Sequence, residues 1–458
     1  MRPMVSNDFD HRLRLWRVDV WLIFVVAVSV RLLLLKEVVA HVCLEKLWIL
    51  VPDSVHYVDM AWDMVRGTDH ASFFLTTWPP GYPAFLAPLL MIFGGPSIVP
   101  TLVQILLSSV SAVLLYVFAL RLTGRRLIAL LSGLLLALSS TSISLSVMLL
   151  SDTLFVFLLL AGFLLFIHAL QTGQWKYFVF SGFLSGYAIL VRAIGEFWPV
   201  VMLMIALLFA FTLTAARSHS IHETGKSIMA KALVCVGIVV AIEGSWMVRN
   251  YYAHGMFFLT TVDSGGLANV AAFRYERADG EFYRDVRARW QAAYAQEHNL
   301  KGLSPEAARK ADLEAAITAL KQHPGQVLQA YMALVWENLI AVNQSYRILL
   351  PEFRSTAERI EWAYLIKRLN YLSVILSLAG FLILIVRRSY ATATVLGLTF
   401  LYFALTIGVT RWQGSRLFFP GQIAALPLIS VSLVAMFDLV WNMSKKALSA
   451  LQLIYSGR

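Results

Sequence analysis

The sequence predicts an all-α polytopic membrane protein, a bundle of about ten transmembrane helices with interfacial helices and a helical insertion on the outer face. Of its 458 residues, 59% are hydrophobic and only 14% are charged, whereas a soluble globular chain is nearer a quarter charged. Apolar runs long enough to span a bilayer recur along the chain, with basic residues beside many of them. The net charge of +11 comes without a compact basic run, which argues against a nucleic-acid partner and for membrane lipids.

The individual spans follow from the length of each apolar run, because a spanning helix needs ~20 mostly apolar residues. The predicted spans are 20–36, 98–120, 127–147, 151–170, 178–194, 196–214, 232–248, 371–386, 391–409 and 420–442. Two further apolar stretches, 81–94 and 328–345, are ambiguous. The first is short and ends at a Gly-Gly-Pro sequence, and the second is interrupted by Glu337, Asn338 and Asn343. We place both at the interface or partly buried, and whether they span the membrane stays open.

The basic loops set the predicted orientation. The positive-inside rule assigns Lys- and Arg-rich loops to the cytoplasmic face. These loops lie at 12–17, 121–126, 217–231, 387–388 and 445–446. Ten spans put all of them on one side, whereas counting either ambiguous stretch alone as a crossing inverts the loops that follow it. The sequence therefore predicts a plasma-membrane (bacterial inner-membrane) protein with both termini in the cytoplasm.

This topology divides the chain into three parts. Residues 1–248 form an N-terminal transmembrane module whose first outer loop, 37–97, carries the proposed active site. Residues 249–370 form a helical insertion on the outer face, and residues 371–458 form C-terminal transmembrane helices with a short cytoplasmic tail. Within the insertion, Ser304-Pro305-Glu306 predicts a helix start, and His323-Pro324-Gly325 predicts its end.

Charged residues that are distant in sequence collect at the outer face in this topology, and charges at span ends are usually functional. They are Asp53, Asp152, Arg192, Glu196, Glu243, Arg249 with Asn250, Arg411 and Arg416. Each also has a purely structural interpretation. The aspartates can be helix N-caps, Arg192 and Arg249 can extend to lipid headgroups, and the last two arginines can anchor a loop.

A second acidic group lies in the stretch 53-DSVHYVDMAWDMVRG-67. His56 has a spacing to Asp59 and Asp63 that two metal ligands on a helix would have. Because Asp59 and Asp63 lie on one helical face, a solvated surface is the favoured interpretation. No cofactor is assigned, and a divalent metal is left open.

Seven short motifs, in order along residues 15–440, resemble the GT-C glycosyltransferases that use polyprenyl-phosphate-linked sugars. The order is most similar to that of the bacterial protein O-mannosyltransferase and lipid A aminoarabinose transferase relatives. The motifs are Asp53-x-x-x-Tyr57-x-x-x-Ala61 with Gly67, 78-WPPGYP-83, 121-RLTGRR-126, 151-SDTLF-155, 246-WMVRNYYAHGMFFLTTVDSGG-266, His323-Pro324-Gly325 and 411-RWQGSRLFFP-420. The chain departs from the family at Asp53-Ser54, where many members have Asp-Glu.

The resemblance implies a GT-C-like bundle and a hexosyl- or pentosyltransferase that moves a sugar from a polyprenyl-phosphate donor to an acceptor hydroxyl outside the cytoplasm, with inversion. The acceptor is a glycan, lipid or protein of the cell envelope. In this scheme Asp53 is the general base. The second acid of the family pattern is either missing here or supplied by Asp152 as a further catalytic residue. Cationic side chains would bind the donor phosphate, and others would bind substrate. The phosphate-binding candidates are Arg249, Arg416, Arg411 and Arg192. The substrate-binding candidates are Tyr57, Tyr82 and Asn250.

The main alternative is a flippase or transporter of a lipid-linked substrate. Transporters often show internal repeats and broken helices around a midplane site. Here the charges gather at the outer interface and the middles of the spans are nearly free of charge. This pattern argues against transport of a polar solute, but not against lipid flipping. A ligase or oligosaccharyltransferase and a receptor or scaffold are further alternatives. The sequence leaves the sugar, the acceptor and the oligomeric state open.

Overall fold

The computed structural model describes residues 9–42, 44–68, 78–95, 97–215, 225–255, 257–342, 356–409 and 414–455. Within these ranges every regular element is a helix, so the all-α prediction is confirmed. The α-helices are α1 (Phe9–His41), α2 (Leu44–Leu47), α3 (Pro52–Arg66), α5 (Gly81–Phe93), α6 (Val99–Thr123), α7 (Arg126–Ala137), α8 (Ser140–Val147), α9 (Ser151–Thr172), α10 (Trp175–Val191), α11 (Trp198–Ala215), α12 (Gly225–His254), α13 (Thr261–Asp279), α14 (Tyr283–Glu297), α15 (Pro305–Gln322), α16 (Pro324–Ile340), α18 (Thr356–Val386), α19 (Tyr390–Thr406) and α20 (Gln422–Tyr455). The short 3₁₀ turns are η1 (Ala193–Gly195), η2 (Ile407–Val409), η3 (Gly414–Arg416) and η4 (Phe419–Gly421).

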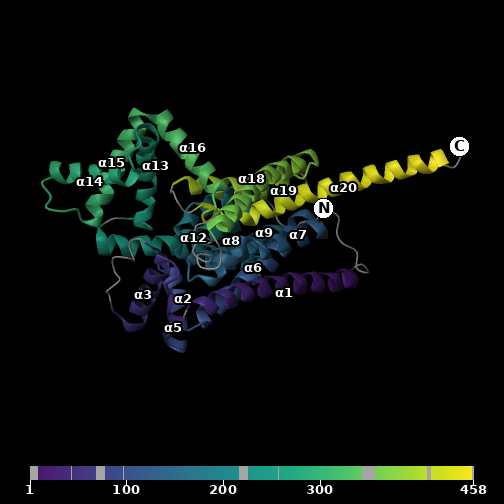
Figure 1. Cartoon of the computed structure of the whole chain (residues 1–458), viewed down its shortest axis with the longest axis horizontal. Coiled ribbons are helices and arrows are strands. Elements are labelled where there is room, and N and C mark those ends of the chain that lie inside the picture. Colours follow the sequence, from purple (N-terminus) through teal and green to yellow (C-terminus); the bar gives the residue numbers. More distant parts are fainter. Residues whose placement is uncertain are drawn as a thin grey trace.

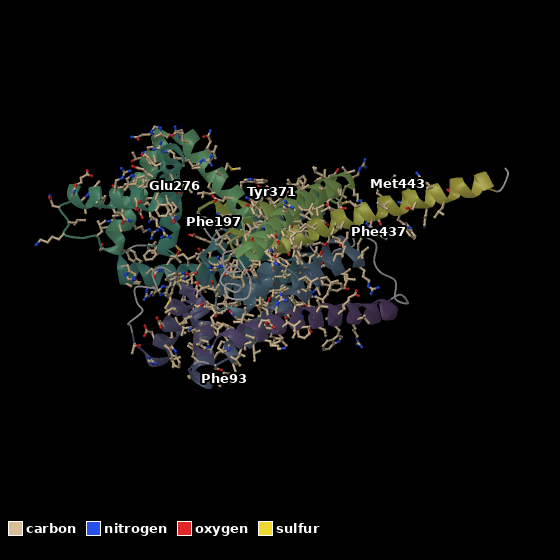
Figure 2. The ribbon with its side chains drawn as sticks, in the orientation of Figure 1. Phe93, Phe197, Glu276, Tyr371, Phe437 and Met443 are labelled. Atoms are coloured by element: carbon tan, nitrogen blue, oxygen red, sulfur yellow. The ribbon has the colours of Figure 1, made fainter. Side chains whose placement is uncertain are left out.

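The chain is a multi-pass membrane protein. Among the described residues, eight helices are long and apolar enough to cross a bilayer, and a ninth span arises if α7 and α8, which meet at a 46° bend, count as one. The remaining predicted span corresponds to α10, an apolar helix of 17 residues, about 25 Å long. Each predicted span therefore coincides with a helix or a bent helix pair. Exposed apolar side chains such as Phe93, Phe437 and Met443 point outward from the bundle, as a lipid-facing surface requires (Figure 2).

The long helices run side by side, and the remaining elements gather at one end of the bundle (Figure 1). Helices α3 and α5 lie at this end on one side, and α13 to α16 lie at the same end on the other side. Helix α1 begins and helix α20 ends at the opposite end. The two segments predicted to lie outside the membrane thus lie together, away from the chain's first and last helical residues.

A buried charge, which was not predicted from the sequence, lies at the bend between α7 and α8. Arg31 of α1 is fully buried and donates hydrogen bonds to the carbonyl oxygen of Ala137, where α7 ends, and to the hydroxyls of Ser142 and Ser108. The helix break frees backbone carbonyls that must find donors inside a membrane. Arg31 supplies such a donor to the carbonyl oxygen of Ala137. It is therefore an exception to the expectation that the middles of the spans are nearly free of charge.

Helix α5 explains the first ambiguous stretch, 81–94. It has 13 residues, about 20 Å of helix, which is too short to cross a bilayer core of ~30 Å. It packs against α3 and α10. Gly81 permits this packing, because a Cβ there would lie 2.6 Å from the backbone of Leu190. Helix α5 therefore fixes α3 to the end of the membrane bundle.

The outer insertion, defined here as α13 to α16, has an apolar core of its own. That core contains Ala268, Phe273, Ala316, Val327 and Leu334 among others. The predicted helix start is confirmed, because the Ser304 side chain accepts a hydrogen bond from the amide of Ala307. The second ambiguous stretch, 328–345, falls largely in α16, which reaches from the insertion to the bundle (Figure 1). The predicted part boundaries at 248/249 and 370/371 fall inside α12 and α18, and the three-part division stays a prediction.

The predicted orientation is tested by labelling single cysteines in a background without Cys43 and Cys235. Glu297→Cys, on the exposed surface of the outer insertion, should react with a membrane-impermeant maleimide on intact cells. Gln174→Cys, in the turn between α9 and α10, should react only after permeabilisation. Labelling of both positions from the same side would contradict the topology.

Candidate active site

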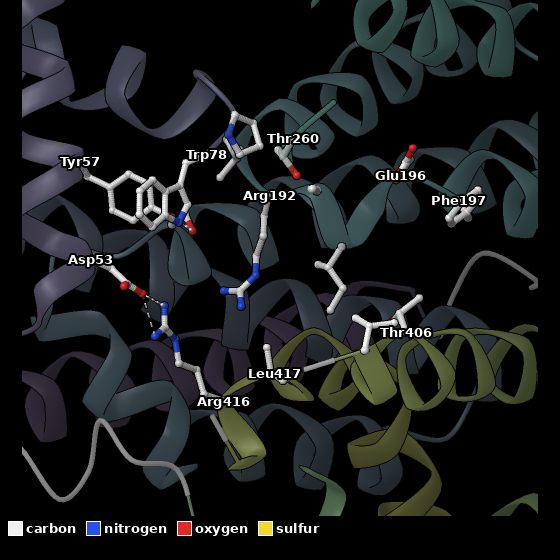
Figure 3. A pocket seen from close by; sticks show the side chains of 16 residues that line it. Asp53, Tyr57, Trp78, Arg192, Glu196, Phe197, Thr260, Thr406, Arg416 and Leu417 are labelled. Atoms are coloured by element: carbon white, nitrogen blue, oxygen red, sulfur yellow. Dashed lines mark hydrogen bonds and ion pairs between the residues drawn. The ribbon is translucent and has the colours of Figure 1, made fainter. Parts of the chain in front are cut away.

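A pocket of about 380 Å³ opens at one end of the bundle, beside α3 and the turn η1 (Figure 3). Asp53 and Tyr57 of α3 line one side, together with Trp78. Thr260, which precedes α13, and Thr406, at the end of α19, line another part. Elements from all three predicted parts of the chain therefore form this one cavity.

Arg416 of η3 joins two of the predicted catalytic residues. Its terminal nitrogens lie 3.2 Å from Asp53 Oδ2, and its Nη2 lies 3.1 Å from Asp152 Oδ2. Arg192 forms an ion pair with the other carboxylate oxygen of Asp152. The four side chains thus form a continuous chain of alternating charge, Asp53–Arg416–Asp152–Arg192, which is called the charge chain below. Three of them line the pocket, and Asp152 lies behind it.

Burial differs sharply along the charge chain. The Asp152 side chain is fully buried, Arg416 is 11% exposed and Asp53 is 31% exposed. Burial opposes the charge of Arg416, but the facing carboxylates of Asp152 and Asp53 outweigh it and raise the pKa of Arg416 above its ordinary value. Arg416 therefore stays cationic, and the more exposed carboxylate of Asp53 faces the pocket.

Asp152 owes its position to the extended residues before α9. Met148 and Leu150 have extended backbones between α8 and α9, and Asp152 lies in the first turn of α9. The carbonyl oxygen of Met148 accepts a hydrogen bond from Gln104 Nε2, and Gln104 Oε1 accepts one from the Tyr82 hydroxyl. Tyr82 therefore supports the segment that positions Asp152.

Tyr57 connects α3 to the start of α9. Its hydroxyl lies 3.1 Å from the Ser151 hydroxyl, and its ring makes an edge contact with Tyr82. Burial, reinforced by the charge of Asp53, raises the pKa of Tyr57 to about 12. The hydroxyl therefore keeps its proton at neutral pH and can donate a hydrogen bond.

Two charged side chains beside the turn η1 line the pocket, Arg192 of the charge chain and Glu196. Arg192 and Glu196 flank η1, and both line the cavity. The Tyr402 hydroxyl donates to the carbonyl oxygen of Ile194 and fixes the turn. In Figure 3 the Arg192 guanidinium lies between Asp53 on one side and Glu196 on the other. The pocket thus offers a guanidinium in its middle and a carboxylate on each side.

The structure brings most of the sequence-predicted site residues together. Asp53, Tyr57, Arg192 and Arg416 line the pocket. Asp152 and Tyr82 are fully buried and contact residues that line it, Arg416 and Tyr57 respectively. Arg411 lies outside the described residues.

Arg249 and Asn250 do not line the pocket. The Arg249 guanidinium bonds to Asn250 Oδ1 at 3.0 Å and lies over the Trp246 ring. Asn250 is fully buried and donates to the carbonyl oxygens of Phe258 and Leu259. Because the next residue is Thr260, Asn250 supports a wall of the pocket, and its position favours a structural role over direct substrate contact.

Trp78 and Glu196 are among the pocket residues that were absent from the predicted site. Trp78 lines the cavity and stacks on His56 with ring centroids 5.0 Å apart, and its signal was its place in the motif 78-WPPGYP-83. Glu196 was noticed only as a charge at a span end. Its spacing of four residues from Arg192 across a turn could have placed both in one site. Among the described residues, no group of three or more His, Cys, Asp or Glu side chains is arranged to hold a metal ion.

Residues 77–246 match the family model described as dolichyl-phosphate-mannose-protein mannosyltransferase. The match confirms the family resemblance predicted from the sequence. The matched range includes Asp152, Arg192 and Glu196, whereas Asp53 and Arg416 lie outside it.

Solved structures with a similar arrangement include oligosaccharyltransferases from Archaeoglobus fulgidus. The oligosaccharyltransferase AglB, in complex with an inhibitory peptide and a dolichol-phosphate, is 13% identical over 92% of this chain and 52% of that chain, with a TM-score of 0.45. A second structure, with Zn and sulfate, is 14% identical over 82% of this chain and 42% of that chain, with a TM-score of 0.42. The chain thus spans about half the length of these proteins or less. No match was found among curated protein sequences.

Asp152→Asn should destabilise the protein strongly, because it leaves two guanidinium groups facing a neutral amide inside the structure. Breaking a buried ion pair costs about 3–5 kcal/mol. As a control, Asp438→Asn removes a partner of Arg125 and Arg387 at the surface, where such pairs contribute about 0–1 kcal/mol. The measurement is the thermal unfolding midpoint in detergent. Equal shifts for the two variants would contradict the structural role of Asp152.

Proposed function

We propose that the protein transfers a sugar from a polyprenyl-phosphate donor to an acceptor hydroxyl at the extracytoplasmic face of the plasma membrane, with inversion at the anomeric carbon. The charge chain carries this proposal, because it places a pocket-facing carboxylate next to buried arginines at the end of a membrane bundle. The family match over residues 77–246 supports the donor class.

Asp53 is the proposed general base. The acceptor oxygen must lose its proton as it attacks the anomeric carbon, and a positioned carboxylate can take that proton. Asp53 is the more exposed of the two aspartates and lines the pocket, whereas Asp152 is fully buried between two arginines. Asp53 therefore takes the base role, and Asp152 becomes a positioning residue rather than the second catalytic acid that the sequence analysis assigned.

Arg192 and Arg416 are the proposed phosphate-binding residues. The leaving polyprenyl phosphate gains negative charge in the transition state, and fixed cationic donors stabilise that charge. The planar guanidinium can donate two parallel hydrogen bonds to two oxygens of a phosphate. Both guanidinium groups are held from behind by Asp152, so they need little reorganisation when the phosphate arrives.

The placement of the pocket suits a lipid-linked donor. The pocket lies at the end of the bundle that is predicted to face outward, and Phe197, which is 62% exposed just before α11, lines it. A polyprenol chain can remain in the bilayer while its phosphate reaches the arginines. Thr260, the residue immediately before the outer insertion, lines the pocket, so the insertion is the part of the chain proposed to contact the acceptor.

Asp53→Asn should lower the rate of sugar transfer about 10²- to 10⁴-fold, since this is the usual contribution of a general base. The matched control is Asp59→Asn, which changes an exposed aspartate two turns further along α3 and should keep nearly full activity. Purified protein in nanodiscs would be supplied with polyprenyl-phosphate sugars and candidate acceptors. NMR of the product would report the anomer.

Three results would count against this assignment. Full activity of a folded Asp53→Asn variant would exclude the base role. A retained anomeric configuration would exclude direct displacement. Movement of lipid across vesicles without transfer to any acceptor would favour the flippase alternative.

Arg192→Ala should reduce kcat about 10²- to 10³-fold, which is the usual loss when one preorganised transition-state donor is removed. Arg66→Ala is the control, because this exposed arginine at the end of α3 lies over the Trp62 ring and does not line the pocket. Steady-state kinetics at varied donor concentration measures kcat and KM separately for each variant. A rise in KM at unchanged kcat would show that Arg192 binds the ground state and transition state equally, contrary to the proposal.

A further inference from the structure

Helix α16 joins the outer insertion to the segment that carries Arg416. Its first eleven residues contribute Val327, Ala330 and Leu334 to the apolar core shared with α13 and α15. Its second half contacts α19 and the turns η2 and η3. Glu337 and Asn338, two of the polar residues that interrupt the apolar stretch 328–345, lie in this second half, and Asn343 lies outside the described residues.

Side chains of α16 bind the backbone where α19 ends. The Tyr331 hydroxyl donates to the carbonyl oxygen of Leu405 at 2.5 Å, and Asn338 Nδ2 donates to that of Ile407 at 2.8 Å. Asn338 is 2% exposed. A buried amide that bonds a carbonyl at a helix end satisfies a group that the helix itself leaves without a donor. Asn338 is therefore explained by this contact.

The end of α16 also binds η3 directly. The amide of Ser415 donates to the carbonyl oxygen of Ala341 at 3.1 Å. Asn370 of α18 donates to the carbonyl oxygens of Ile340 and Ala341. Residue 415 is adjacent to Arg416, so these bonds hold the backbone from which the arginine extends.

Gly414 makes the approach of η3 to α16 possible. It has φ +56°, and a Cβ at this position would lie 2.3 Å from the carbonyl oxygen of Val342. Because that obstacle is backbone, it cannot move aside as a flexible side chain would. Any residue other than glycine must displace η3 from the end of α16.

We propose that Asn338, Asn370 and Gly414 are positioning residues for the transfer reaction, which set Arg416 against Asp53 and Asp152 through the end of α16. The contacts of Arg416 with both carboxylates are only 3.1–3.2 Å long, so a shift of η3 by about 1 Å breaks them. This inference rests on the proposed function of Arg416. It makes the outer insertion part of the catalytic assembly, because the core that holds α16 also sets the position of Arg416.

A double-mutant cycle tests the proposal. Gly414→Ala should lower kcat about 10²-fold, the scale of a ~1 Å misplacement, and Asn370→Ala about tenfold. The Arg416→Lys variant is expected to retain residual activity. In this background each change should lower kcat less than about threefold further, because the arginine whose position the change would disturb is already absent. Asn338→Ala should behave like Asn370→Ala.

Gly280→Ala is the matched control. Gly280 has φ +73° in the outer insertion, and a Cβ there meets nothing within 4 Å. Alanine at position 280 would have the same kind of backbone strain as alanine at position 414, but its Cβ would collide with no neighbouring atom. The Gly280→Ala variant should therefore keep activity within about twofold.

The same cycle is measured by thermal unfolding midpoints, which need no substrate. Gly414→Ala and Arg416→Lys should be strongly non-additive in both measurements. Additive losses in both would overturn the positioning role while leaving the proposed function intact. If the wild-type protein transfers no sugar but the midpoints are non-additive, the proposed function fails and the structural coupling stands.

Discussion

The ion pairs of Arg416 with two aspartates are the interaction on which the rest of the site depends. Asp53 and Asp152 lie 363 and 264 residues away from it in sequence, on α3 and α9. Without a cation between them, two carboxylates would face each other in a partly buried space and repel. Arg416 therefore allows both carboxylates to lie at this end of the bundle, with Asp53 facing the pocket.

Burying these charges has a large cost, and the surrounding polar groups show how the fold offsets it. A buried ion pair is stable only when its geometry is good and its remaining hydrogen-bonding groups are satisfied. Around Asp152, both carboxylate oxygens meet guanidinium groups, and the preceding backbone is held through Gln104 and Tyr82. Such an arrangement contributes little net stability but fixes two guanidinium groups in place, which phosphate stabilisation requires.

The sequence predicted the membrane bundle well because the bilayer imposes length and polarity on every span. It predicted the site in part for a similar reason, since Asp53, Asp152, Arg192 and Arg416 all lie at the ends of spans on one face. It did not predict Arg31, whose charge is offset by carbonyl and hydroxyl oxygens from other helices. It also did not separate Arg416 from Arg249, because equal charge at equal depth gives no information on which side chains converge.

Buried residues that do not line the pocket still shape it. Asn250 binds the backbone just before Thr260, and Asn338 binds the backbone just after Thr406. Both are buried amides that bond carbonyls in segments bearing pocket residues. Where loops line a cavity at a membrane surface, exposed carbonyls would otherwise draw water into the site. Buried amides thus give irregular segments the rigidity that helices supply elsewhere, and this favours a pocket whose arginines are in place before the donor arrives.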